Sequence, residues 1–410
     1  MSFIYRIFNF QNTFRLDLKV IGPILLLCII GLIALKSASL DTLGQHSVFY
    51  NQIRWILIGS IIFFVIQFIR SNLFYEFAYI MYLILLILLF ITLFMPKING
   101  SSRWILIGGM QFQPSEFGKI IFIIAISRFI TDYRDSFSSH QMIISCAFLT
   151  LFPLVFILQQ PDFGTGIVYL LPILPMLYWA DVDTKKIVLY IFPIISMLAQ
   201  QNLIVFYIWM FLLIIILLLI SKKMIHVIIN FILNSAFGLL APYAWKYGLH
   251  EYHQNRIIEL LNPGSSPLGA GYQILQSKVA IGSGGILGKG LGEGTQSYLR
   301  FLPIKDSDFI LSVISEEMGF LCIIIITIIF LSFIYFNIDF AQRLFNKFQS
   351  TSIIGFCSLL FFHMIINMSM VVGLFPVIGL PFPFISYGGS FMITCFIIIG
   401  IMNNTANNDL

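Results

Sequence analysis

The sequence has 410 residues, of which 59% are hydrophobic and 10% are charged, and its mean hydropathy is +0.95. Soluble domains have about a quarter of their residues charged, so this composition excludes a soluble globular protein. The formal net charge of +5 comes largely from loops between apolar stretches, which predicts an orientation in a membrane and no nucleic-acid partner.

Twelve apolar stretches follow one another along the chain. A helix of about 20 residues crosses the ~30 Å hydrocarbon core of a bilayer, so each stretch is interpreted as a span. They lie at about 20–36, 54–69, 74–95, 115–131, 141–159, 164–180, 187–200, 202–220, 224–245, 308–336, 352–373 and 388–402. The expected fold is therefore an all-α polytopic membrane protein, a single integral membrane domain over 1–410 with about 10–12 transmembrane helices. Two short segments within 187–223 form either one broken helix or an extra helical hairpin.

Lysine and arginine gather in every second loop, for example at Arg15, Arg70, Arg134 and Arg343. Positively charged loops stay in the cytoplasm, and an even number of spans returns the chain to its starting side. We therefore expect both termini in the cytoplasm and the long loop at about 246–307 outside.

The first polar motif along the chain joins Arg103-Trp104 to the run QPSEFGK at 113–119. Arg103 and Trp104 suit contact with a lipid headgroup, although a simple interfacial anchor explains Trp104 equally well. Glu116 and Lys119 are three residues apart on an expected helix, so they can pair with each other or bind a ligand.

Asp162 is the single carboxylate of the next outer loop, in the run QPDFG at 160–164. Two interpretations remain for it, an exposed turn residue and a residue of a binding site.

The outer loop at about 246–307 is a polar, glycine-dense interruption of the apolar chain. Ten of the 29 glycines fall between Gly264 and Gly294. Glycine permits close approach of backbone to a ligand, and successive N–H groups can form an anion-binding nest. With the basic residues alongside them, these glycines suit an anionic, sugar-bearing or pyrophosphate ligand; a flexible connection is the alternative. The basic residues are Lys278, Lys289, Arg300 and Lys305.

Nucleotide and metal motifs do not account for this loop. Lys289 is followed by Gly290 and not by Ser or Thr, so a phosphate-binding Walker loop is excluded. The five cysteines fall in apolar runs and are interpreted as small buried hydrophobic residues.

The span at 308–336 begins with Asp308, Ser312 and Glu316, spaced four residues apart. This spacing predicts one helix face, and ionisable groups at membrane depth suggest function. The alternative is an interhelical structural pair, for which Lys119 is one candidate partner.

Breaker residues crowd the segment 373–390 near the C-terminus, which contains the run SYGGS at 386–390. Irregular backbone at membrane depth is tolerated only where protein or a cavity surrounds it. We therefore expect a re-entrant loop that lines a cavity, and we expect His363 and Asn367 to bond to neighbouring helices.

These motifs, in this order, resemble those of the SEDS proteins (shape, elongation, division and sporulation), most closely the RodA type. The resemblance covers almost the whole chain. It is carried by Arg103-Trp104, QPSEFGK at 113–119, QQPDFGTG at 159–166, GAGYQILQSKVAIGSGGILGKG at 269–290, GTQS at 294–297, FLP at 301–303, DFI at 308–310, SEEMGF at 315–320 and GLPFPFISYGGS at 379–390.

The resemblance implies a peptidoglycan glycosyltransferase of the bacterial cytoplasmic (inner) membrane. Such an enzyme polymerises lipid II, the undecaprenyl-pyrophosphate disaccharide pentapeptide, at the outer face during cell-wall elongation and cell-shape maintenance. Its implied partners are a class B penicillin-binding protein and membrane lipids. The reaction needs a base and cationic or metal stabilisation of the leaving pyrophosphate, so a divalent cation (Mg²⁺ or Mn²⁺) is a candidate cofactor. No nucleotide and no haem are implied.

The same resemblance implies the site residues. Catalytic roles are expected at position 266 and at Asp308. Substrate binding is expected at Arg103, Glu116, Lys119, Asp162, Tyr272, Gln273, Gln276, Ser277, Lys278, Gln296, Glu316 and Ser386.

The chain departs from the family at one essential position. The family has an Asp immediately before the Pro of a Pro-x-Gly-x-Gly-Tyr stretch, and here that position is Ser266. A serine hydroxyl cannot replace a carboxylate as base or metal ligand. Either another acid takes over, or the chain is slow or inactive, or this loop aligns a few residues away. The nearest carboxylates in sequence are Glu259, Glu293, Asp306 and Asp308.

Two other functions compete with polymerisation. The serine at 266 favours a catalytically weak subunit that scaffolds or activates the partner transpeptidase. Polar residues along 308–336 would suit a transporter of lipid-linked precursors, but a transporter should show paired broken helices, and the sequence has one breaker-rich hairpin.

Overall fold

The structure is a computed structural model that describes residues 17–38, 47–98, 100–108, 110–220, 223–248, 251–262, 269–295 and 306–408. Four residues of the predicted site lie outside the described residues: Ser266, Gln296, Arg300 and Lys305.

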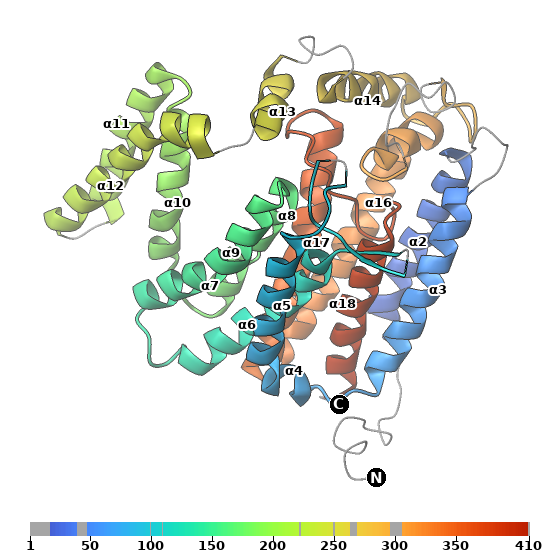
Figure 1. Cartoon of the computed structure of the whole chain (residues 1–410), viewed down its shortest axis with the longest axis horizontal. Helices are drawn as coiled ribbons and strands as arrows, with labels where there is room; N and C mark the ends of the chain where they lie inside the picture. Colours follow the sequence, from blue (N-terminus) through green and yellow to red (C-terminus); the bar gives the residue numbers. More distant parts are fainter. Residues whose placement is uncertain are drawn as a thin grey trace.

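Helices form a bundle with a small two-stranded antiparallel sheet at one end (Figure 1). The first part contains α2 (Leu18–Ala38), α3 (Ser47–Gln67), α4 (Asn72–Glu76), α5 (Ala78–Thr92), β1 (Ile105–Ile107), β2 (Met110–Phe112), α6 (Pro114–Tyr133), α7 (Ser139–Gln159), α8 (Phe163–Leu170) and α9 (Ile173–Trp179). The second part contains α10 (Thr184–Ala199), α11 (Leu203–Ile220), α12 (Met224–Tyr243), the π-helix η1 (Ala244–Gly248), α13 (Glu251–Leu261), α14 (Ala270–Gly284), α16 (Ile310–Arg343), α17 (Lys347–Val371) and α18 (Gly389–Asn408).

Each of the twelve predicted spans coincides with a helix or with two consecutive helices. In the described part of the chain, eight helices are long and apolar enough to cross a membrane, so the protein is a multi-pass membrane protein. Two further apolar stretches are shorter, Ala78–Thr92 and Phe163–Trp179. The second of these is divided at Pro172, the N-cap of α9, because proline cannot donate to the preceding turn.

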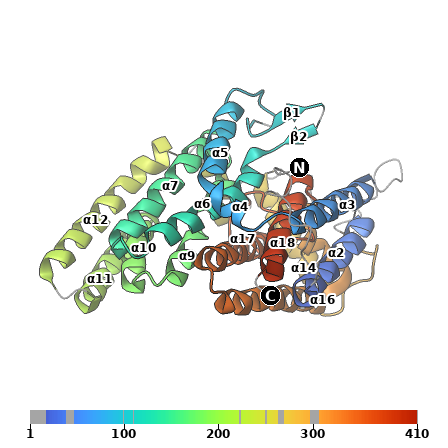
Figure 2. The ribbon, with the colours of Figure 1, turned by 90° about the horizontal axis from the view of Figure 1, so that it is seen from below.

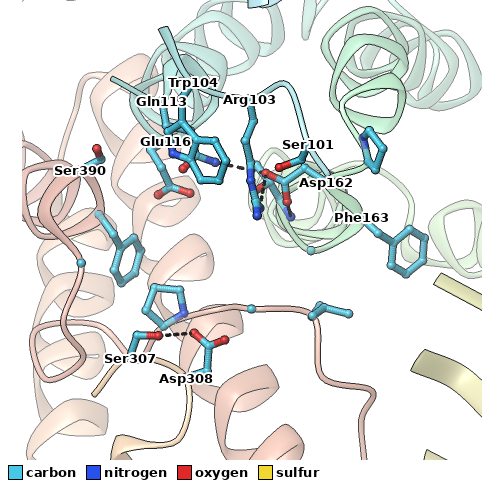
Figure 3. A pocket seen from close by; sticks show the side chains of 18 of the residues that line it. Ser101, Arg103, Trp104, Gln113, Glu116, Asp162, Phe163, Ser307, Asp308 and Ser390 are labelled. Atoms are coloured by element: carbon cyan, nitrogen blue, oxygen red, sulfur yellow. Dashed lines mark hydrogen bonds and ion pairs between the residues drawn. The ribbon is translucent and has the colours of Figure 1, made fainter. Parts of the chain in front are cut away.

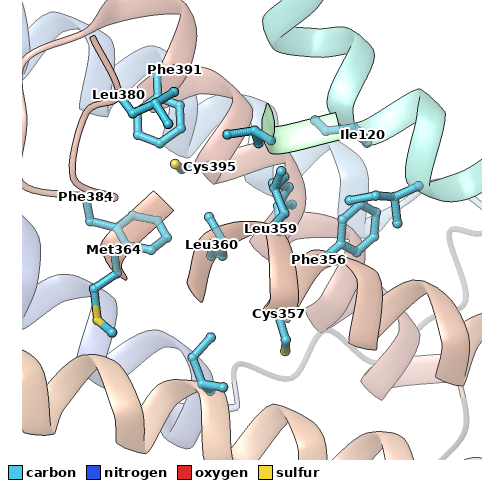
Figure 4. Packing of buried hydrophobic residues seen from close by; sticks show 14 of the residues in the cluster. Ile120, Phe356, Cys357, Leu359, Leu360, Met364, Leu380, Phe384, Phe391 and Cys395 are labelled. Carbon is cyan, nitrogen blue, oxygen red and sulfur yellow. The ribbon is translucent and has the colours of Figure 1, made fainter. Parts of the chain in front are cut away.

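A continuous core of apolar side chains joins most of the helices (Figure 4). Phe356, Leu360, Phe384 and Cys395 lie in it with at most 2% of their surface exposed. Figure 4 shows side chains from α17, α18 and the loop between them meeting there. Four of the five cysteines are buried, as predicted for small hydrophobic residues: Cys28, Cys146, Cys357 and Cys395.

Helices α10, α11 and α12 stand beside this bundle with an apolar core of their own (Figures 1 and 2). A buried polar link holds them together: Trp209 Nε1 donates to Ser196 Oγ at 2.8 Å, and Ser196 Oγ donates to Asn234 Oδ1 at 2.8 Å. Since α10 and α11 pack against each other, the short segments within 187–223 form a hairpin and not one broken helix.

The segment between α17 and α18 folds back into the bundle, as the breaker residues predicted. Phe382, Phe384 and Ile385 of this loop are at most 1% exposed. The side chain of Asn367, on α17, donates to the Leu380 carbonyl at 2.7 Å. Phe382 N donates to Ser386 Oγ at 2.8 Å. These bonds replace the helical partners that the irregular backbone lacks.

The glycine-rich loop after α14 packs backbone to backbone against a kink in α16. Gly319 takes φ 80° and ψ 174° inside this helix, a conformation that favours glycine. The N–H of Phe320 donates to the Gly285 carbonyl at 3.0 Å across the contact. A Cβ atom at Gly284 would lie 2.0 Å from the Ser315 carbonyl oxygen, so a side chain there is excluded.

We predict that Gly284→Ala destabilises the protein by about 1–3 kcal/mol, because the added methyl group forces α14 away from α16. Thermal unfolding of the protein in detergent measures the change. Gly282→Ala is the matched control, since a Cβ at Gly282, in the same helix, meets nothing within 4 Å. Equal unfolding temperatures for the two variants would contradict the packing.

Candidate functional site

A cavity of about 1200 Å³ is lined in part by residues of α13 (Figure 3). Figure 1 shows α13 at one end of the bundle. Segments far apart in the sequence form its wall: residues within 97–116, 161–165, 251–256, 307–308 and 377–391. Five of the predicted site residues line it: Arg103, Glu116, Asp162, Gln273 and Asp308.

Asp162 is a buried member of this wall, only 4% exposed, which excludes the exposed-turn interpretation. Its Oδ2 lies 3.4 Å from Arg103 Nη1 and accepts a hydrogen bond from Gln113 Nε2 at 3.2 Å. Its Oδ1 accepts from Thr165 N at 3.3 Å and so caps the start of α8. The Arg103 guanidinium also stacks on Trp104, 4.5 Å from the ring centre. The motif at 103–104 and the motif at 159–166 therefore meet in one ion pair.

Glu116 and Lys119 form the predicted pair on α6, with Lys119 Nζ 2.7 Å from Glu116 Oε1. Both are buried, at 8% and 1% exposed. Lys119 Nζ also lies 3.3 Å from Nε2 of His363 on α17. Glu116 lines the cavity, whereas Lys119 lies behind the wall. Figure 3 shows the carboxylate of Glu116 among the side chains that line the cavity.

Asp308 lies in a turn before α16 begins at Ile310, so it is not on the helix face predicted for it. Its Oδ1 accepts a hydrogen bond from Ser307 Oγ at 2.8 Å (Figure 3). Its carbonyl accepts from Asn367 Nδ2 at 2.9 Å, and Ser386 Oγ donates to the Ser307 carbonyl at 2.6 Å. Ser386 does not line the cavity; its hydroxyl holds the turn that presents Asp308.

The surroundings of Asp308 raise the pKa of its carboxyl group. Burial raises the pKa of this carboxyl group above its ordinary value, because the charged form loses hydration. The hydrogen bond from Ser307 and the charges of Arg256 and Arg103 oppose this shift. A carboxylate with a raised pKa in a cavity is a candidate for general acid–base chemistry.

Glu316 is fully buried away from the cavity, and its partner is Lys289. Lys289 Nζ lies 2.8 Å from Glu316 Oε1, and Thr295 Oγ1 donates to the same oxygen at 3.0 Å. Glu316 is thus in a structural ion pair, as the alternative interpretation held, but its partner is Lys289 and not Lys119, because α14 and its glycine loop, and not α6, cover this part of α16.

The predicted residues of α14 divide between two faces. Gln273 lines the cavity, and its Oε1 is buried without a hydrogen-bond partner among the described residues. Ser277 is buried against α16, with its Oγ 2.8 Å from Ser312 Oγ. Tyr272, Gln276 and Lys278 lie outside the cavity wall.

Helix α13 contributes cavity residues that sequence reasoning missed: Glu251, Tyr252, His253 and Arg256. Arg256 stacks on Tyr252, 5.0 Å from the ring centre, and donates Nη2 to the Tyr252 hydroxyl at 2.9 Å. Its Nη1 is buried and has no hydrogen-bond partner in the described part of the chain. Tyr252 and Arg256 are four residues apart, and this helical spacing was the available signal.

The described residues do not form a ready site for a divalent cation. Of the four carboxylates that line the cavity, Asp162 is paired with Arg103 and Glu116 with Lys119, which leaves Glu251 and Asp308. Across the described ranges, no three His, Cys, Asp or Glu side chains gather to hold a metal. We therefore assign no chemical step to a cation.

The chain is similar to known proteins in both sequence and fold. The FTSW_RODA_SPOVE family model, described as a cell cycle protein, matches residues 18–206 and 184–409. The peptidoglycan glycosyltransferase MrdB of Escherichia coli strain K12 is 32% identical over 96% of this chain and 94% of its own. The peptidoglycan glycosyltransferase RodA of Treponema pallidum strain Nichols is 27% identical over 94% and 96%. A chain of a solved peptidoglycan synthase complex, described as coordinating polymerization and crosslinking, shares the fold, with TM-score 0.70, 22% identity and coverage of 98% and 99%.

We predict that Lys119→Met lowers the free energy of unfolding by about 3–5 kcal/mol, because it leaves the buried Glu116 carboxylate without its counter-ion. Adding Glu116→Gln in the same chain should restore most of the loss, since the uncompensated charge is then removed as well. Thermal unfolding in detergent compares the two proteins. A double variant as unstable as the single one would show that the charge pair is not the cause.

Proposed function

The chain belongs to the FtsW/RodA/SpoVE family of cell cycle proteins, and from this premise we propose that it is a peptidoglycan glycosyltransferase. It polymerises lipid II into glycan strands during cell-wall elongation. The main structural support is the cavity. Its wall contains Asp308, Arg256 and the Arg103–Asp162 ion pair.

The reaction joins two lipid-linked disaccharides. The 4-hydroxyl of one GlcNAc attacks the anomeric carbon of the MurNAc of another, and the bond from that carbon to the pyrophosphate breaks. The hydroxyl proton passes to a base, and undecaprenyl pyrophosphate leaves with the bonding electrons. The enzyme must therefore supply a carboxylate near the hydroxyl and positive charge near the pyrophosphate.

Asp308 is the base in this proposal. Of the four carboxylates near position 266 in the sequence, Asp308 alone lines the cavity in the described part of the chain; the others are Glu259, Glu293 and Asp306. Its Oδ1 accepts a hydrogen bond from Ser307. Its Oδ2 faces Gly379, which has no side chain; a Cβ atom there would lie 3.7 Å from this oxygen. Its raised pKa makes the carboxylate a stronger base than an exposed aspartate.

Arg256 and Lys97 receive the pyrophosphate. Both line the cavity, and Arg256 Nη1 retains an unused donor among the described residues. A guanidinium can bind two phosphate oxygens at once, and stacking on Tyr252 holds its plane. Arg103 is less available, because Asp162 already neutralises it.

The cavity faces outward from the cytoplasmic membrane, and both termini are inside. Support comes from the distribution of Lys and Arg between loops. The two ends of the described chain also meet, with Asp17 N donating to Asn403 Oδ1 at 3.2 Å. Figure 1 places the end of α18 opposite α13 and α14.

A class B penicillin-binding protein is the partner in this proposal. The support is that a chain with this fold occurs in a peptidoglycan synthase complex that coordinates polymerization and crosslinking. Polymerised strands leave the cavity uncrosslinked, so a transpeptidase must take them up nearby.

We predict that the purified protein, given lipid II, Mg²⁺ and its cognate class B penicillin-binding protein, produces glycan ladders on a gel. The same reaction with EDTA in place of Mg²⁺ tests the candidate cation. Ser266→Asp should increase the yield, because it restores the acid that the family carries. If neither the wild-type protein nor Ser266→Asp makes polymer with the partner present, the enzyme proposal is wrong and the scaffold function replaces it.

We predict that Asp308→Asn lowers the polymerisation rate by about 10²–10⁴-fold, because an amide cannot accept the proton. The wild-type rate should also fall as the pH is lowered through the pKa of Asp308, because the protonated acid cannot act as a base. Since burial raises this pKa, the fall should begin at a higher pH than it would for an exposed aspartate. Initial rates of ladder formation across pH measure both effects. Glu293→Gln, at an exposed carboxylate outside the cavity wall, is the control. An equal loss in the control would remove Asp308 from the mechanism.

A further inference from the structure

His363 connects the buried ion pair of α6 to the re-entrant loop. The side chain is completely buried in the middle of α17. Its Nε2 lies 3.3 Å from Lys119 Nζ, and its Nδ1 lies 3.3 Å from the Pro381 carbonyl oxygen. Its ring packs on Phe391 with the ring centres 4.6 Å apart. Pro381 and Phe391 both line the cavity, so His363 supports the cavity wall from behind.

The two partners of His363 determine which ring nitrogen carries the proton. A proline carbonyl can only accept, so Nδ1 must donate to Pro381. A lysine ammonium can only donate, so Nε2 must accept from Lys119. The imidazole is therefore neutral, protonated on Nδ1, and it fixes one N–H of the ammonium.

Of His363, Lys119 and Glu116, only Glu116 lines the cavity. One carboxylate oxygen, Oε1, is held by Lys119. The other, Oε2, is buried and has no hydrogen-bond partner in the described ranges. A buried carboxylate oxygen without a donor is costly, and a ligand that supplies a donor would relieve the cost. Glu116 lines the cavity, so that donor can come from a bound molecule.

Lys119 could turn toward either oxygen of Glu116 if nothing held it. The contact with His363 and the Phe391 ring, whose centre is 5.5 Å from Nζ, restrain the ammonium on the side of Oε1. The position of Lys119 thus decides which oxygen of Glu116 is left without a hydrogen-bond partner at the cavity wall.

We propose that His363 is a positioning residue: it holds Lys119 against Oε1 of Glu116, so that Oε2 accepts a hydrogen bond from a hydroxyl or amide N–H of the substrate's sugar. This inference rests on the proposed function, because it takes the lipid-linked disaccharide as the ligand. His363 itself does not touch the substrate.

The test measures binding of lipid II to the full-length protein in detergent micelles, separately from polymerisation. His363→Leu should weaken binding about tenfold, because the ammonium loses its second acceptor and Oε2 its orientation. His363→Gln should stay within about threefold of wild type, since an amide supplies one acceptor for Lys119 and one donor for Pro381. Met364→Ala, at the next residue of the same helix, removes buried volume without touching Lys119 and should lower thermal stability while leaving the dissociation constant within about twofold.

A double-variant cycle with Glu116→Gln separates positioning from general damage. If His363 acts through Glu116, adding His363→Leu to Glu116→Gln should weaken binding by less than about twofold more. Additive losses, or a glutamine variant as weak as the leucine variant, would overturn the proposal. A wild-type protein that does not bind lipid II would overturn it too. A protein that binds lipid II but makes no polymer would instead count against the proposed activity alone.

Discussion

Hydrogen bonding of the irregular backbone between α17 and α18 is the constraint on which the cavity depends. Hydrocarbon offers no partner for a peptide N–H or C=O, so this loop must find its partners inside the protein. The side chain of Asn367 bonds the carbonyls of both Leu380 and Asp308. The hydroxyl of Ser386 accepts from Phe382 N and donates to the Ser307 carbonyl. The bonds that make the loop tolerable thus also fix Asp308 and Pro381 in the cavity wall.

A second constraint is the close contact between α14, its glycine-rich loop and α16. The sequence suggested that these glycines cradle an anion. In the structure, Gly284 and Gly288 lie where a Cβ would meet carbonyl oxygens of α16, at 2.0 and 2.3 Å. Lys289, expected to face a ligand, is held by Glu316. Gly284 and Gly288 therefore serve backbone packing between α14, its loop and α16.

Two ion pairs hold charged groups of the cavity wall in place. Arg103 neutralises Asp162, and Lys119 neutralises Glu116. The first pair joins two loops, and the second joins successive turns of α6. Removing one partner of a buried ion pair is strongly destabilising, because it leaves the other charge uncompensated. Asp308 is bonded instead to the neutral hydroxyl of Ser307, which leaves it the carboxylate best suited to exchange a proton.

The number and order of the apolar segments follow from the amino-acid sequence, because the length and hydropathy of a span are local properties. The Glu116–Lys119 pair follows from it as well, since three residues on a helix bring two side chains together without help from the rest of the fold. Three contacts emerge only from the folded chain: Lys289 pairs with Glu316, Arg103 pairs with the buried Asp162, and α13 lines the cavity. These contacts join residues tens to hundreds of positions apart, and only the packing of the helices brings such residues within hydrogen-bonding distance.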